Sequence, residues 1–238
     1  MPGICAALGG SASPRSNVLT DRLLRGLRGR PLAAAPRRRL ARCLAAIPPA
    51  GRLLYLASME SRPSDAVRLV VSGLDAPALV AFLGRIAPAA VARRAAAAAS
   101  LVAGAARTHL SFDVGEEVEV RVGIECSFPR LPSREPRWAG LLDAWTAAGL
   151  CTLEQRSALL AWTGYDSFWT AAPRWPVAAE TAGTFCIRCL SHLKLICAAD
   201  GPTAKAYLLF GSLRPNLSPA TGASRMDGSG RLASEAPL

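Results

Sequence analysis

This sequence has few of the side chains on which many enzyme centres depend. Its 238 residues include two histidines and three tyrosines, and only two of its 28 basic residues are lysine. Two histidines exclude a histidine-rich metal centre, and we expect neither a metal nor a cofactor. The sequence also lacks a phosphate-binding glycine-rich loop and the Gly-x-Gly-x-x-Gly, His-Glu-x-x-His and Gly-x-Ser-x-Gly motifs. These absences exclude the common nucleotide-binding and hydrolase signatures.

The sequence contains no hydrophobic run long enough to cross a membrane. The longest, Ala95–Ala106, has twelve residues, whereas a spanning helix needs about 20. Residues 1–14 lack the positive start and the long apolar centre of a signal peptide. Seven cysteines, an odd number without such a signal, are typical of reduced thiols rather than of a disulfide framework. We therefore predict a cytoplasmic protein without a membrane span.

Positive charge is concentrated at the N-terminus. The net charge is +11, but residues 1–52 contain ten arginines and one acid, whereas the remainder has eighteen basic and sixteen acidic residues. The abundance of Ala, Arg, Gly and Pro is typical of a GC-rich genome, which explains the overall charge without a basic binding face. We predict a basic, largely disordered extension over 1–51, an α+β domain over 52–211 and a disordered tail over 212–238. The extension also resembles an organelle transit peptide in composition.

Three pairs of strand-like runs mark the predicted domain, and each pair is joined by a turn-rich link that is typical of a β-hairpin. The pairs are 52–59 with 67–73, 108–114 with 118–128, and 191–197 with 203–210. Helix-periodic segments separate them, at 77–86, 91–107, 136–149 and 152–162. This order predicts an α+β fold in which three antiparallel hairpins share one sheet, with helix pairs on one face.

Alternation along these strands gives the sheet one apolar face, which suits the helices, and one polar face. The polar face gathers both lysines and a histidine with arginines, a tyrosine and two carboxylates, namely Arg121, Arg188, His192, Lys194, Lys205, Tyr207, Asp113 and Glu125. One interpretation is an ordinary solvated face. The other is a site for an anionic group such as phosphate or diphosphate, because clustered cations and a phenol bind such groups.

Lys205-Ala206-Tyr207, on the last predicted strand, resembles a recurrent Lys-x-Tyr element of the ABBA-barrel aromatic prenyltransferases. His192-Leu193-Lys194 is similar to a basic pair on the preceding strand of that family. The family closes helix-flanked hairpins into a barrel whose inner Lys, Arg and Tyr side chains bind an isoprenoid diphosphate. The resemblance implies that a carboxylate, Glu125 or Asp113, orients the acceptor as the catalytic group. With only three hairpins, it implies a partial barrel.

These observations leave two functions open, and they do not decide whether the protein is an enzyme. The leading prediction is a binding or accessory protein of biosynthetic type, whose ligand is an isoprenoid diphosphate or a peptide added at an open sheet edge. The alternative is an active prenyltransferase that uses an isoprenoid diphosphate donor.

Two further patterns are assigned structural roles. Segments 136–149 and 152–162 could imitate a DNA-reading helix-turn-helix, but the second offers only Glu154 and Arg156 as charged groups, so we predict no nucleic-acid binding. Cys186 and Cys189 have the spacing of zinc and redox sites, but there is no second pair, and the surrounding pattern is that of a strand. We predict that both thiols are buried.

Overall fold

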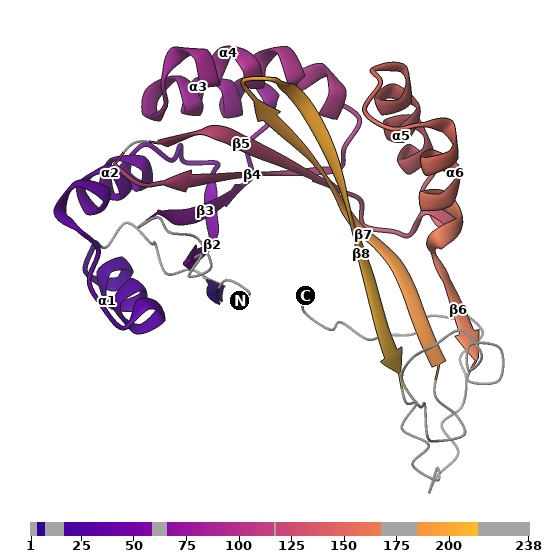
Figure 1. The fold of residues 1–238 in the computed structure, drawn as a ribbon, viewed down its shortest axis with the longest axis horizontal. Helices are drawn as coiled ribbons and strands as arrows, with labels where there is room; N and C mark the ends of the chain where they lie inside the picture. The colour runs from indigo at the N-terminus through magenta and orange to yellow at the C-terminus, as the bar shows by residue number, and fades with distance from the viewer. Residues whose placement is uncertain (1–3, 8–16, 59–65, 117, 168–184, 214–238) are drawn as a thin grey trace, which may run out of the picture. The chain divides into compact units, whose positions relative to one another are not determined.

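One antiparallel sheet organises the part of the chain that the computed structural model describes, which is residues 4–7, 17–58, 66–116, 118–167 and 185–213. The strand order is β1-β2-β3-β4-β5-β7-β6, and β8 also pairs with β7 (Figure 1). The strands are β1 (Ile4–Ala7), β2 (Arg52–Ser58), β3 (Val67–Ser72), β4 (Arg107–Val114), β5 (Val118–Ser127), β6 (Gly164–Ser167), β7 (Phe185–Ala198) and β8 (Gly201–Leu213). Within this part of the chain the order does not return to β1, so the sheet is open.

The helices pack on the apolar face of this sheet. They are α1 (Asn17–Arg28), α2 (Ala34–Ala45), α3 (Ala76–Ile86), α4 (Ala89–Ala98), α5 (Arg137–Ala147) and α6 (Leu153–Trp162), with short 3-10 turns at Ala99–Val102 and Pro132–Arg134. Side chains from α2, α3, α4 and α5 form one core with those of the strands. At its centre Phe82 of α3 meets Phe112 of β4 edge to face, with ring centroids 5.9 Å apart. The predicted α+β fold with an antiparallel sheet is confirmed.

Local sequence signals explain where individual elements begin. Asp75 caps α3, because its carboxylate accepts a hydrogen bond from the Ala78 backbone N–H at 2.8 Å. Thr152 and Gln155 form a capping box at the start of α6, in which each side chain accepts a hydrogen bond from the other residue's backbone N–H. The three predicted hairpins are present as β2–β3, β4–β5 and β7–β8.

The folded domain begins before Arg52. The prediction of a largely disordered extension over 1–51 is therefore wrong for residues 4–7 and 17–51, which the structure describes. The helices α1 and α2 contribute Leu24, Leu40 and Cys43 to the core. Strand β1 pairs with β2 in antiparallel register. Burial of apolar side chains outweighs the repulsion among the arginines, which lie mostly on the exposed side of α2. Residues 1–3, 8–16 and 214–238 of the two predicted disordered ends lie outside the described residues.

The described chain divides into two units. Met1–Tyr165 and Ile187–Gly211 form the first, and Asp166–Cys186 with Ser212–Leu238 form the second. All described features that bear on function lie in the first unit. No helix among the described residues is long and apolar enough to cross a membrane.

Candidate anion-binding site

A pocket of about 400 Å³ lies on the polar face of the sheet, and we call it the polar pocket. Five of the eight predicted site residues line it: Asp113, Arg121, Lys194, Lys205 and Tyr207. Side chains of β3, β4, β5, β7 and β8 meet here, because neighbouring strands place their polar positions side by side. The polar pocket is completed by Arg68, Ser111, Phe112, Val122, Gly123 and Ile196.

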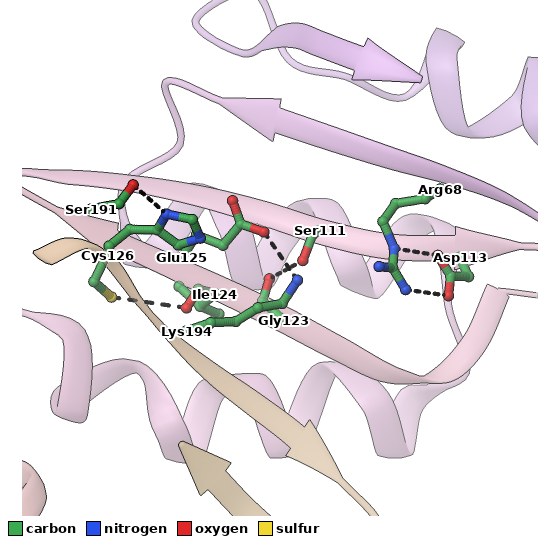
Figure 2. Close-up of polar contacts among 10 residues, drawn as sticks. Arg68, Ser111, Asp113, Gly123, Ile124, Glu125, Cys126, Ser191 and Lys194 are labelled. Carbon is green, nitrogen blue, oxygen red and sulfur yellow. Dashed lines mark hydrogen bonds and ion pairs between the residues drawn. The ribbon is translucent and has the colours of Figure 1, made fainter. Parts of the chain in front are cut away.

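Arg68 and Asp113 form a two-pronged ion pair at one end of the polar pocket. They are direct partners in the register of β3 and β4. The Arg68 Nε and Nη2 atoms donate to the two carboxylate oxygens at 2.7 Å each (Figure 2). Asp113 is only 4% exposed, and a carboxylate so buried needs a paired cation. The hydrogen bond to Asp113 raises the pKa of Arg68, so the guanidinium group stays charged.

A second buried ion pair joins Lys194 of β7 to Glu125 of β5, with Nζ donating to Oε1 at 3.0 Å (Figure 2). The two side chains are 10% and 11% exposed, and the residues are partners in the register of the two strands. This pairing holds the ammonium group of Lys194 at the wall of the polar pocket. It also neutralises one of the two carboxylates that were predicted to act on an acceptor.

Gly123 makes room for the Lys194 side chain. A Cβ at position 123 would overlap Lys194 Cε and lie 2.7 Å from Ser111 Oγ. Ser111 Oγ in turn donates to the carbonyl oxygen of Gly123 at 3.2 Å. A glycine inside a strand often marks such a close approach. The missing side chain therefore lets Lys194 lie flat over β5.

Both histidines lie on the polar face beside Glu125. His109 is the register partner of Glu125 in the pairing of β4 with β5. The His192 ring stacks on Tyr207, with centroids 4.2 Å apart and the planes at 15°. Burial lowers the pKa of each histidine, against the opposing charge of Glu125. Neither histidine therefore adds a positive charge at neutral pH, and His192 instead holds the Tyr207 ring in place.

The polar pocket keeps an excess of positive charge. Arg68 and Lys194 are balanced by Asp113 and Glu125, as described above. Among the ion pairs of the described residues, none includes Arg121 or Lys205, and both residues are exposed. Two cationic side chains, from β5 and β8, are thus available at the pocket to an anion from solution.

Arg188 is not brought together with the other predicted ligands. Its guanidinium lies over the Trp162 ring of α6, with Cζ 5.6 Å from the ring centroid. The reason is a change of phase along β7. Leu190 belongs to the same core as Leu193, so the alternation shifts by one residue between them, and Arg188 falls on the helix side.

Arg68, Ser111 and Gly123 were not predicted as site residues. Arg68 lies on the polar face of the first hairpin, but only the pairing of β3 with β4 identifies it as the partner of Asp113. Gly123 carries its own sequence signal, because it takes a polar-face position, between Arg121 and Glu125, in a strand that otherwise alternates between apolar and polar side chains.

The prediction that both thiols are buried holds for Cys186 but not for Cys189. Cys186 is buried and Cys189 is half-buried, and burial raises the pKa of the Cys189 thiol. Among the described residues, no group of three His, Cys, Asp or Glu side chains is arranged to hold a metal ion.

No protein-family model, curated protein or solved structure matches this chain. Its function must therefore be argued from the chemistry of the polar pocket. That chemistry consists of fixed cations, a stacked phenol and two carboxylates that are already paired. Such a set can hold an anion by charge-assisted hydrogen bonds.

Proposed function

We propose that this protein binds a small anionic molecule of the phosphate or diphosphate class in the polar pocket. The observation that supports this most is the convergence of Arg121, Lys194 and Lys205 from three different strands on one concavity. On a purely solvated face, Arg121 and Lys205, which no described acid pairs with, would repel each other across this concavity. An oxyanion between them would remove that repulsion.

The residues that line the polar pocket differ in burial, and each contributes to binding in a different way. Lys205 and Arg121 are exposed and meet the ligand first, since no described acid pairs with them. Lys194 is fixed by Glu125 and offers a positioned ammonium group at the wall of the polar pocket. Tyr207, which is 39% exposed and stacked on His192, lines the polar pocket together with Lys205. Cations of this kind bind phosphate oxygens through strong hydrogen bonds.

Binding is favoured over transfer because of the state of the two carboxylates. A transferase of the proposed type needs a carboxylate that is able to orient an acceptor. Asp113 accepts hydrogen bonds from two guanidinium nitrogens of Arg68, and Glu125 accepts one from Lys194. The better-supported function is therefore that of a cytoplasmic binding or accessory protein of biosynthetic type.

The alternative function is transfer from an isoprenoid diphosphate. It is favoured by one observation, the position of Lys205 and Tyr207 together at the polar pocket, as the Lys-x-Tyr element requires. Here Lys194 would turn toward the diphosphate, and Glu125 would be released to orient the acceptor. Formation of a prenylated product from dimethylallyl diphosphate, with release of diphosphate, would distinguish this function from binding alone.

A thermal-shift titration tests the proposal. Inorganic diphosphate and dimethylallyl diphosphate are titrated into the wild-type chain and into a Lys205→Ala/Tyr207→Phe variant. The loss of one charge-assisted hydrogen bond costs about 1.5–3 kcal/mol, so the ligand concentration needed for a given shift rises roughly tenfold or more.

The control is Arg93→Ala, which removes an exposed arginine of α4 on the helix side. It should leave the response to both diphosphates unchanged. An equal response from the wild type and the double variant would remove the proposed site.

A further inference from the structure

The outer edge of β8 carries an unusual run of exposed apolar side chains. Of the six large hydrophobic side chains that are exposed among the described residues, four are consecutive on this strand, and Tyr207, Leu208 and Leu209 are 39%, 47% and 54% exposed. Among the described strands, β8 pairs with β7 alone. No other described strand lies along its second edge, beside this apolar run.

A long hydrophobic edge strand is an uncommon feature, because it invites another strand to pair with it. The exposed side chains of β8 also lie on both faces of the sheet. Tyr207 lines the polar pocket, whereas Leu208 lines a separate apolar pocket beneath α5 and α6. Only a partner that adds at the edge, as a further strand, covers side chains on both faces at once.

The sequence of β8 is complementary to itself when the strand is reversed. In an antiparallel pair with its own copy about a two-fold axis through Leu208, that residue meets its symmetry mate. Tyr207 then lies opposite Leu209, and Ala206 opposite Phe210, so apolar residues pair with apolar residues on each face.

The charge on β8 is compatible with the same register. Lys205 lies opposite Gly211 rather than opposite a second Lys205. Like charges placed directly opposite are destabilising, so the register centred on Leu208 avoids the main electrostatic cost of self-pairing. Registers centred on Lys205 would bring the two ammonium groups together.

We infer that β8 is a homodimer interface, in which two copies of this chain pair edge to edge through an antiparallel β8–β8 contact centred on Leu208. This isologous contact has two-fold symmetry and leaves no further copy of the same edge exposed. It also sets Leu209 of the partner subunit beside Tyr207 at the rim of the polar pocket. The inference does not depend on ligand binding.

Sedimentation velocity of the full chain tests this interface over a concentration range of about 1–100 μM. The wild type should shift from monomer to dimer within this range. Leu209→Glu should raise the dimer dissociation constant at least roughly tenfold, because it brings an unpaired carboxylate to the apolar contact. The matched control is Leu153→Glu, which makes the same change at a 71% exposed leucine on α6 and should leave the dissociation constant unchanged.

The register is tested by rescue. A Leu209→Glu/Tyr207→Lys double variant places a carboxylate opposite an ammonium group twice in the two-fold pair. Its dimer should be tighter than that of either single variant. Circular dichroism of every variant establishes that the chain is folded.

Disulfide trapping detects the dimer even when the two copies associate weakly. Leu208→Cys lies on the proposed axis, where opposed Cα atoms are about 4.5–5.5 Å apart, within disulfide range. It should give a linked dimer under mild oxidation, whereas Thr203→Cys, on the same strand but far from the axis, should not. A wild type that stays monomeric at all concentrations, or equal linking by both cysteines, would overturn the inference. The edge would then be a site for a peptide from another protein.

Discussion

At the scale of single residues, the polar pocket depends on the lack of a side chain at Gly123. Lys194 lies across this position and reaches Glu125 at 3.0 Å. The pair is buried, and a buried pair that loses one partner leaves an uncompensated charge. Room at Gly123 is thus a condition both for the ion pair and for the placement of the ammonium group.

Gly123→Ala is predicted to lower the free energy of unfolding by about 1–3 kcal/mol, because the added methyl group overfills this site. It should also weaken diphosphate binding, since Lys194 must move away. Chemical denaturation and a diphosphate titration measure the two effects. Gly140→Ala is the control, because a Cβ there meets no atom within 4 Å, and alanine in a helix stabilises by about 1 kcal/mol. Equal effects of the two substitutions would contradict the proposed role of Gly123.

The two histidines predict a pH dependence of stability. Burial lowers the pKa of His109 and of His192 in the folded state. The unfolded chain therefore binds protons more readily, and folding is favoured most above the ordinary histidine pKa of about 6.5. The free energy of unfolding should fall as the pH decreases from about 7.5 through 6.5 toward the lower folded-state values.

Urea denaturation at several pH values measures this slope. A His109→Gln/His192→Gln variant should lose most of the dependence above pH 5.5, the range in which carboxylates contribute little. A slope that persists unchanged in this variant would assign the dependence to other groups.

At the scale of elements, the sequence predicts strands and helices where local signals and burial agree. The three hairpins show period-two alternation between turn-rich links, and the capping box places the start of α6. Two expectations failed for different physical reasons. The apolar stripe of α2 is narrow and surrounded by arginines, so the packing of Leu40 and Cys43 into the core was not predicted. The phase change before Leu193 depends on packing of Leu190 in the core, which no local pattern reveals.

We expect the capping box to contribute a larger part of the stability of α6 than in a packed helix, because none of the residues of α6 is buried. Thr152→Ala is predicted to destabilise α6 by about 1 kcal/mol. Amide hydrogen exchange of Leu153–Trp162 should accelerate by roughly fivefold. Ser157→Ala, which removes an exposed hydroxyl in the middle of the same helix, should not accelerate it. Uniform protection in all three proteins would show that packing, rather than the cap, holds the helix.

At the scale of the whole molecule, the sheet separates two kinds of chemistry. One face forms the core with the helices, and the other holds buried ion pairs around a pocket with excess positive charge. Which residues share that polar face was predictable from alternation for Lys194, Lys205 and Tyr207. The sequence did not reveal which of these charges are neutralised, because Arg68 and Glu125 meet their partners only through the register of neighbouring strands.

Calorimetric titration of inorganic diphosphate tests the central claim most directly. It compares the wild type with Lys205→Gln/Arg121→Gln, which removes the two pocket cations that no described acid pairs with, and with Lys205→Arg, which retains the charge. We predict saturable one-to-one binding by the wild type and the charge-retaining variant, and a dissociation constant at least roughly tenfold higher in the double variant. Equal dissociation constants for the wild type and the double variant, or the absence of any binding to the wild type, would contradict the assignment of the polar pocket as an anion site.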